Sequence, residues 1–319
     1  MAKDKKIRLA LIAGGESSER EVSLKGGDQV EGALDKDKYD IIRYDPAYDL
    51  QVLVKDAGRI DVAFVLLHGK YGEDGTIQGL LDLLHIPYQG SGVLGSALAM
   101  DKELSRTLYS QAGLNIPRGK VMRPGSYSAE AIAAEFGLPV VIKPVDQGSS
   151  IGMNIPQTVE EVKKGLAEAF KYSARVLVEE YIKGVEITGG VIGNDELEAL
   201  PIVEIIPGEG HVFFDYQAKY QAGATKEICP ARISASLTQN AQECAVTAHR
   251  TLRLRGYSRT DMIIRDDRIY VLETNTIPGM TRTSLLPLAA REAGMDFSTL
   301  LDRLIMLSLE AAGKAIPSK

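Results

Sequence analysis

Apolar positions early in the chain form short continuous runs that end at glycines. Residues 7–13 are one such run, and it stops at Gly14-Gly15 before a stretch of hydroxyl and carboxylate side chains. A continuous apolar run of this length is typical of a strand buried on both faces, and the polar stretch is typical of the first turn of a helix. Residues 59–67 form a second run of this kind. Strand, glycine turn and helix in this order predict a doubly wound α/β unit.

Farther along, the pattern predicts a second unit in which strands and helices alternate. We expect helices at residues 128–136 and 159–170, and strands at residues 138–144 and 175–182. A third part is expected to begin with two antiparallel strands within residues 185–206. Its helices are predicted at residues 238–254 and within 285–313.

Residues 259–279 form two β-branched runs that predict a hairpin, and polar residues occupy alternate positions in each run. Side chains two apart on a strand share a face, so Arg259 is grouped with Asp261, and Glu273 with Asn275. If the two faces coincide, two carboxylates and an amide converge, which suits Mg²⁺ beside a substrate's phosphates. The competing interpretation is a solvated hairpin face with scattered charge.

The register of this hairpin decides between the two interpretations. A regular loop of two residues, Asp266-Asp267, would pair Asp261 with Leu272 and turn Glu273 to the opposite face. Shared metal binding therefore requires a loop of three residues or a β-bulge between the strands.

The composition is that of an ordinary globular protein. A length of 319 residues predicts two or three domains, and the net charge of −6 with few aromatic residues disfavours nucleic acid as a partner. No apolar run is long enough for a membrane helix, and two cysteines without a CxxC pattern indicate neither a disulfide framework nor a metal site. We therefore expect a cytoplasmic protein.

Two loops near the chain's start carry candidate chemistry. The first turn of the expected helix after Gly15 is acidic, so Glu19 and Glu21 either attract an ammonium group or only favour the helix dipole. His68 and Glu73 lie in a glycine-rich loop that follows a strand, where α/β proteins bind ligands. Taken alone, His68 is more simply a structural histidine.

The second unit carries groups that suit a nucleotide. Lys143 lies at a strand tip, and the glycines and serines of residues 147–152 offer donors to phosphate oxygens. Glu179 and Glu180 end a strand and suit the amino group of a purine, although a charged sheet edge is the commoner explanation. Aromatic and cationic residues at 213–226 predict a lid that excludes water.

Several motifs in this order closely resemble the D-alanine–D-alanine ligase family of the ATP-grasp superfamily. They span nearly the whole chain: Gly14-Gly15 with residues 19–23, His68-Gly69 with residues 72–76, residues 100–102, Lys143-Pro144 with residues 148–150, Tyr216 with Lys219-Tyr220, and Glu273 with residues 275–276, 278–281 and 284–285. The resemblance implies an α/β fold of the α+β ATP-grasp type with three domains. These are an N-terminal doubly wound parallel sheet at residues 1–98, a central ATP-grasp domain at 99–182 and a C-terminal ATP-grasp domain at 183–319.

The resemblance also implies an activity. The carboxylate of one D-alanine attacks the γ-phosphate of ATP, and the amine of a second D-alanine attacks the acyl phosphate, giving D-alanyl-D-alanine for peptidoglycan precursors. Mg²⁺ (two ions, with Mn²⁺ as a substitute) and lysines must offset the repulsion between carboxylate and triphosphate. A homodimer is implied as well.

Site residues follow from the same resemblance. ATP contacts are assigned to Lys102, Lys143, Ser149, Ser150, Glu179, Glu180, Tyr181, Ile182, Glu186, Lys219 and Asn275. Metal ligands are assigned to Asp261, Glu273 and Asn275. D-alanine contacts are assigned to Glu19, His68, Arg259, Gly279, Ser284 and Leu285, and catalytic roles to Glu19, Ser149, Tyr220, Arg259, Gly279 and Ser284. Under this assignment, Glu19 receives the ammonium group of the first D-alanine.

Three alternatives remain at this stage. Ligases that join D-alanine to D-lactate share most of the motifs, and Tyr220 favours the dipeptide. A nucleotide-binding module without catalysis is disfavoured by the presence of Arg259, Asp261, Glu273 and Asn275, and a dinucleotide oxidoreductase by the lack of GxGxxG. Phe214 stands where some family members have tyrosine, which leaves one lid contact in doubt.

Overall fold

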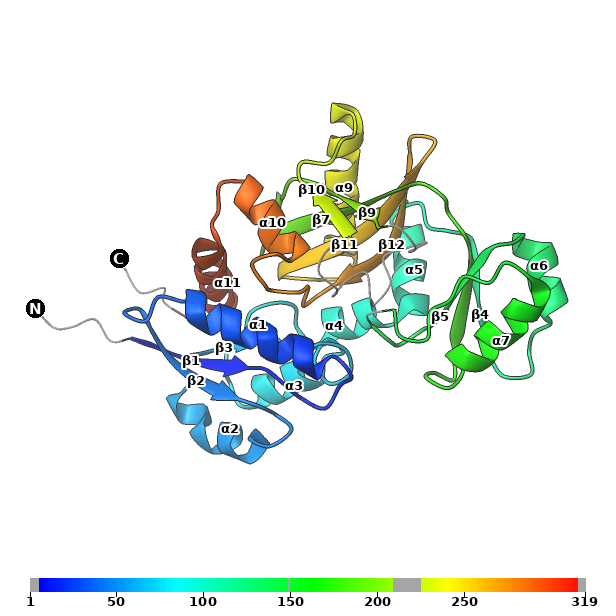
Figure 1. The fold of residues 1–319 in the computed structure, drawn as a ribbon. Coiled ribbons are helices and arrows are strands. Elements are labelled where there is room, and N and C mark those ends of the chain that lie inside the picture. Colours follow the sequence, from blue (N-terminus) through cyan, green and yellow to red (C-terminus); the bar gives the residue numbers. More distant parts are fainter. Residues whose placement is uncertain (1–5, 149, 209–224, 315–319) are drawn as a thin grey trace, which may run out of the picture.

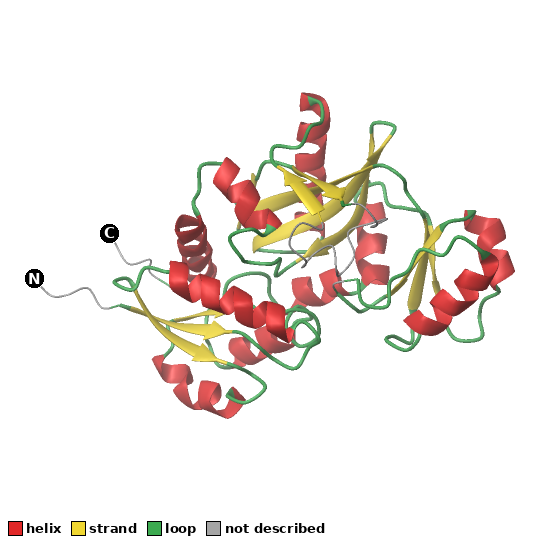
Figure 2. Cartoon of the chain, in the orientation of Figure 1, coloured by secondary structure: helices red, strands yellow, loops and turns green. Residues whose placement is uncertain are grey.

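The computed structural model, which describes residues 6–148, 150–208 and 225–314, has three units (Figure 1). The N-terminal unit is built on a parallel sheet, and the other two are built on antiparallel sheets (Figure 2). No helix in these ranges is long and apolar enough to cross a membrane.

The N-terminal sheet has the strand order β2-β1-β3, with β1 at Ile7–Ile12, β2 at Tyr39–Tyr44 and β3 at Val62–Val65. Every residue of β1 except Arg8 is buried, because alternate side chains enter two different cores. Helices cover both faces, as the doubly wound prediction requires: α1 (Arg20–Ala33), α2 (Leu50–Asp56) and α3 (Thr76–Leu83), with a 3₁₀ turn at Ala57–Arg59.

The central unit is a small antiparallel sheet covered by two helices. Its strand order is β4-β6-β5, with β4 at Gly119–Met122, β5 at Val140–Pro144 and β6 at Val176–Glu180. Helices α6 (Ala129–Phe136) and α7 (Val159–Ala169) begin at the side-chain caps Ser128 and Thr158 and share one core with the sheet.

The C-terminal sheet follows the path β10-β9-β7-β11-β12, and β8 pairs with β7. Its strands are β7 (Val185–Gly193), β8 (Glu198–Ala199), β9 (Val203–Pro207), β10 (Thr225–Ile228), β11 (Gly256–Arg265) and β12 (Arg268–Asn275). The expectation of two strands within residues 185–206 was wrong, because the return segment is split into β8 and β9. Pro201, which has no N–H to donate, lies in the break.

Four helices connect the units. Helices α4 (Val93–Met100) and α5 (Lys102–Gln111) pack on β12, and α5 also contacts α9 (Ala235–Thr251). Helices α10 (Leu285–Glu292) and α11 (Phe297–Ala311) share one core with β1 and β3 of the first sheet and with strands of the C-terminal sheet (Figure 1). The last helices of the chain therefore complete the packing of its first strands.

The β11–β12 hairpin contains a bulge, one of the two arrangements that the sequence prediction allowed. Its loop is Asp266-Asp267, both with positive φ (50° and 57°), and Met262 pairs with Val271 in regular register. The register then shifts, so Asp261 lies opposite Glu273 instead of Leu272. The extra residue in β12 brings the two carboxylates together.

Candidate active site

A cleft between the central unit and the C-terminal sheet encloses about 1000 Å³, its open mouth included. Apolar side chains from both units line it, among them Met153, Met262 and Leu272. Most of the residues that the sequence assigned to ATP also line it: Lys102, Lys143, Ser150, Glu179, Glu180, Tyr181, Ile182 and Glu186. An apolar cleft with few polar groups is typical of a small-molecule site.

Lys143 is held toward the cleft by a buried carboxylate. Its Nζ lies 2.7 Å from Glu179 Oε2, and Glu179 Oε1 accepts a hydrogen bond from Arg106, which also donates to the carbonyl of Pro117 at 2.6 Å. Both oxygens of Glu179 are thus engaged by cations, so in this state Glu179 orients Lys143. The sequence reasoning missed Arg106, because nothing in its helix distinguishes it from an ordinary surface arginine.

Lys102 lies where the cleft approaches the hairpin. It is the first residue of α5, whose N-cap Asp101 accepts hydrogen bonds from two backbone N–H groups and from Arg175. The buried Nζ of Lys102 donates to the carbonyl of Gln147 at 2.7 Å and lies 3.5 Å from Glu273 Oε2. One lysine therefore bridges the glycine–serine loop and one of the two hairpin carboxylates.

Asp261 is the centre of a hydrogen-bond network on the cleft face of the hairpin. Arg259 donates to its two oxygens at 2.9 and 2.7 Å, and Asn275 Nδ2 donates at 3.1 Å. Thr188 of β7 donates its hydroxyl at 2.7 Å, a contact that the sequence reasoning missed because β7 lies far away in the chain. The four residues predicted to share this face, Arg259, Asp261, Glu273 and Asn275, are brought together by the bulge.

The donor set at the hairpin consists of two carboxylates and one amide oxygen. Within the described ranges, no group of three histidine, cysteine, aspartate or glutamate side chains could hold a metal. The oxygens of Asp261, Glu273 and Asn275 still suit a hard cation, since Mg²⁺ takes few carboxylates and completes its shell with substrate phosphates and water. Arg259 and Lys102 offset the carboxylate charges in this state.

A second polar cluster lies in the N-terminal unit. Glu19, at the N-terminus of α1, and His68, after β3, are both buried. Glu73 accepts a hydrogen bond from the N–H of Gly69 at 2.8 Å. Burial, reinforced by the charge of Glu19, raises the pKa of Glu73 to about 8. Burial lowers the pKa of His68, although Glu19 opposes this shift.

The glycine–serine loop of the central unit reaches this acidic cluster. A Cβ placed on Gly148 would lie 3.6 Å from Glu19 Oε2 and 3.9 Å from Glu73 Oε2. A small cavity between the units is lined by Glu73, Gly148, Lys102, Glu273 and Asn275, among others. Lys102 and Glu273 also line the larger cleft, so the two spaces adjoin.

Ser284 and Leu285 lie at the start of α10, where backbone N–H groups of the first helical turn suit a carboxylate. The Ser284 hydroxyl accepts from the N–H of Thr281 at 3.1 Å, and a Cβ on Gly279 would lie 3.1 Å from it. Gly279 and Ser284 are therefore neighbours. The remaining assigned residues, Ser149, Lys219 and Tyr220, lie outside the described residues, as does Phe214.

Comparison with known proteins places these features in context. Residues 108–306 match the family model "D-ala D-ala ligase C-terminus", and residues 48–91 match "D-ala D-ala ligase N-terminus". A D-alanine–D-alanine ligase from Syntrophobacter fumaroxidans is 57% identical over 96% of this chain and 98% of its own.

Solved structures agree with the sequence matches. The D-alanine–D-alanine ligase of Bacillus anthracis complexed with ATP is similar with a TM-score of 0.85 and 34% identity, covering 96% of this chain and 99% of its own. The VanG D-Ala:D-Ser ligase of Enterococcus faecalis is similar with a TM-score of 0.81 and 33% identity, covering 95% of this chain and 100% of its own.

Proposed function

The chain belongs to the D-alanine–D-alanine ligase family, and we infer that the enzyme joins two D-alanines while ATP is cleaved to ADP and phosphate. The product serves peptidoglycan precursor synthesis. We place the reaction in the cytoplasm, where ATP is supplied, and take the working form to be a homodimer.

One observation carries the proposed mechanism: Gly148, in the loop that would bind phosphate, packs against the acid that would bind an ammonium group, Glu19. A D-alanine held through its ammonium group by Glu19 would direct its carboxylate toward the cleft that takes ATP. Substrate carboxylate and γ-phosphate would then meet between the units, which supplies the proximity that the first step needs.

In the first step, the carboxylate oxygen of D-alanine attacks the γ-phosphorus, the bond to the β,γ-bridging oxygen breaks, and ADP leaves. Lys102 and Lys143 offset the negative charge that accumulates on the phosphates. Glu179 keeps Lys143 directed into the cleft, and Arg106 fixes Glu179. The acyl phosphate that results is shielded from water by the surrounding units.

The hairpin oxygens of Asp261, Glu273 and Asn275 would hold Mg²⁺, which neutralises phosphate charge when it is bound. Arg259 and Lys102, which contact Asp261 and Glu273 here, would share these carboxylates with the metal ion or turn toward the substrates.

In the second step, the amine of another D-alanine attacks the acyl carbon, and phosphate leaves. Arg259 and the N–H of Gly279 would stabilise the oxyanion of the tetrahedral intermediate. The start of α10, with Ser284 and Leu285, would bind the carboxylate of the second D-alanine.

The test is phosphate release with D-alanine, L-alanine, D-lactate and D-serine offered separately and in pairs, followed by product analysis. We expect release with D-alanine alone and D-alanyl-D-alanine as the main product. D-serine is included because of the similarity to the VanG D-Ala:D-Ser ligase. A preference for D-lactate or D-serine as the second substrate would assign the enzyme to the corresponding alternative activity. Phosphate release in the absence of any D-amino acid would refute both the D-alanine–D-alanine ligase activity and these alternatives.

A further inference from the structure

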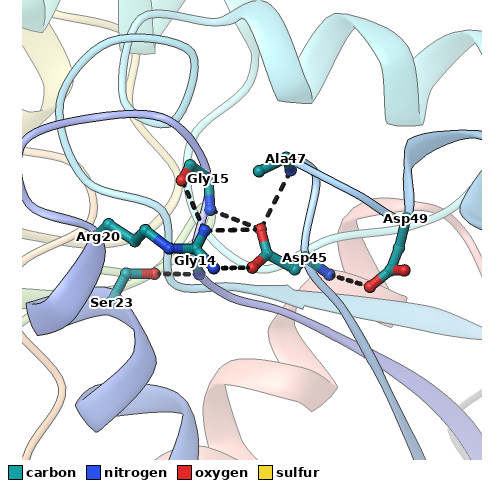
Figure 3. Close-up of polar contacts among 7 residues, drawn as sticks. All are labelled: Gly14, Gly15, Arg20, Ser23, Asp45, Ala47 and Asp49. Carbon is teal, nitrogen blue, oxygen red and sulfur yellow. Dashed lines mark hydrogen bonds and ion pairs between the residues drawn. The ribbon is translucent and has the colours of Figure 1, made fainter.

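Another polar cluster of the N-terminal unit contains Arg20, the residue that follows Glu19 in the chain. Asp45 follows the last residue of β2, and its carboxylate reaches across to the turn between β1 and α1 (Figure 3). It accepts hydrogen bonds from the N–H of Gly15 at 2.9 Å and from the N–H of Ala47 at 3.1 Å. Asp49 fixes the Asp45 backbone by accepting from its N–H at 2.9 Å.

Arg20 completes this cluster from the helix side. Its guanidinium donates to the two oxygens of Asp45 at 3.1 and 2.5 Å and to the carbonyl of Gly15 at 2.8 Å. Asp45 and Arg20 thus bind Gly15 through both its N–H and its C=O. We call this arrangement, Asp45 with Arg20 and Gly15, the turn clasp.

The backbone around the clasp leaves little freedom. Gly14 has φ of 102°, and a Cβ there would lie 2.5 Å from the Asp45 carboxylate, so both the conformation and the space require glycine. The N–H of Gly14 donates to the Ser23 hydroxyl of α1 at 2.8 Å. Burial opposes the charge of Asp45, but hydrogen bonds from Arg20, Gly15 and Ala47 outweigh it and lower the pKa of its carboxyl.

The turn clasp fixes the backbone next to Glu19, the residue that precedes Arg20. Glu19 is the N-cap residue of α1, it is 2% exposed, and its carbonyl accepts the helical hydrogen bond from Ser23. Arg20 is the first residue of that helix, so its guanidinium ties the helix end to the carboxyl end of β2. A shift of this end would move Glu19 relative to Gly148.

We propose that Asp45 is a positioning residue for the first D-alanine: through Arg20 and Gly15 it fixes the end of α1, so that Glu19 points at the ammonium site. The proposal rests on the function proposed above, in which Glu19 receives this ammonium group. Asp45 lines neither the ATP cleft nor the small cavity beside Gly148 and Glu73.

The same sheet provides a matched control at its opposite end. Arg8 of β1 donates to Asp61 at 2.9 and 2.6 Å, and Asp61 also accepts a backbone N–H, that of Arg8, at 2.9 Å. Both clusters are therefore two-bond arginine–aspartate pairs in which the aspartate also accepts from backbone N–H groups, two at Asp45 and one at Asp61. Only the Asp45 pair lies beside Glu19.

The experiment compares Asp45→Asn and Asp61→Asn by initial rates of phosphate release at varied D-alanine and ATP, together with thermal unfolding. For Asp45→Asn we expect the KM of the first D-alanine to rise by about 10- to 100-fold, because a misplacement of about 1 Å can cost about 10²-fold. The KM of ATP should stay unchanged. For Asp61→Asn we expect a similar loss of thermal stability with both KM values unchanged.

Arg20→Gln gives a second route if Asp45→Asn does not fold, and Arg20→Lys should recover part of the loss because it keeps one charged donor. In the double variant Asp45→Asn/Arg20→Gln, the KM of the first D-alanine should be no higher than in the more impaired of the two single variants, since both substitutions act through the same turn clasp. An unchanged first D-alanine KM in the Asp45 and Arg20 variants, an equal rise in Asp61→Asn, or a parallel rise in the KM of ATP would overturn the proposal. A wild-type enzyme without D-alanine-dependent phosphate release would instead refute the proposed function.

Discussion

Arg259 and Asp261 are paired with each other in this structure, and each has a different partner in the proposed mechanism. The guanidinium occupies both oxygens of a carboxylate that we assign to a metal ion. The pair keeps two charged groups satisfied in a partly buried place, where an unpaired charge would be costly. In the proposed mechanism, Asp261 takes the metal ion as a partner and Arg259 turns toward the reacting substrates.

Arg259→Ala tests this role. We expect kcat to fall by about 10²–10³, the size of effect seen when one oxyanion donor is removed, with little change in ATP affinity. The kcat of Arg259→Lys should lie between those of wild type and Arg259→Ala, because lysine keeps the charge but lacks the planar guanidinium. Steady-state rates and nucleotide titration measure both quantities. Lost ATP binding with normal turnover of the bound complex would show that the role is wrong.

Glu73 is predicted to make stability depend on pH. Its pKa is raised from 4.5 to about 8, so between these values the folded protein retains a proton that the unfolded chain loses. The cost to folding is absent below the lower value, grows as pH rises and is complete above about 8. As pH rises from about 5 to about 8, wild type should lose unfolding free energy through this cost and Glu73→Gln should not. The stability of Glu73→Gln relative to wild type should therefore increase over this range.

Urea unfolding at several pH values measures this difference. Replacement of the exposed Glu21 by glutamine is the control, and its difference from wild type should not follow the same pH dependence. A gap between wild type and Glu73→Gln that stays constant with pH would mean that Glu73 is ionised in the folded protein throughout.

At the scale of elements, the hairpin combines a tight turn with a bulge. Asp266 and Asp267 both have positive φ in a two-residue loop, which is the backbone of a type I′ turn. Asparagine followed by glycine suits this turn better than two aspartates do. The turn lies at the far end of the hairpin from Asp261 and Glu273, so it can be changed without altering the site.

The double substitution Asp266→Asn/Asp267→Gly should raise the unfolding free energy by about 1 kcal/mol, because asparagine and glycine adopt positive φ with less strain than the two aspartates do. Turnover should stay unchanged. Asp267→Ala is the matched control and should bring no gain, since alanine keeps the strain. Thermal unfolding with activity measurements decides, and a less stable Asn-Gly variant would contradict this account of the turn.

This hairpin also shows what the sequence could predict. Alternation within one strand is local information, so residue order predicted the shared face of Arg259 and Asp261. It also predicted that either a longer loop or a bulge must precede Glu273, and the structure has the bulge. Contacts made by lone residues of distant elements could not be predicted in this way. Arg106 on Glu179, Thr188 on Asp261 and Asp45 on Arg20 depend on how elements pack, which no pattern within their own segments records.

At the scale of the whole molecule, the cleft has walls from different units. Tyr181 follows the last strand of the central sheet, and Met262 and Leu272 belong to the C-terminal sheet. A nucleotide bound there joins units that otherwise meet mainly through connecting helices. Sequence periodicity predicted elements in each unit, but it missed β2 and α2, and it did not predict that α5 would pack on β12.

Binding of ADP with Mg²⁺ should therefore stabilise the enzyme. At a free concentration about 100 times Kd, we expect about 2.7 kcal/mol of added stability. The gain should shrink when EDTA replaces Mg²⁺, and also in Glu273→Gln. Thermal unfolding with and without the divalent cation measures it. An equal gain without any cation would argue against metal binding at the hairpin.

The position of α11 has a consequence for synthesis of the protein on the ribosome. Leu9 and Leu11 of the first strand share a core with Leu300 and Leu304 of the last helix. Translation releases β1 well before α11, so the apolar side chains that these two elements bury together lack this cover in the meantime. Helix α1 shares the same core and can cover part of this face of the sheet earlier. The nascent chain therefore exposes part of its first sheet until α11 has emerged, and chaperones that shield apolar surface can bind there.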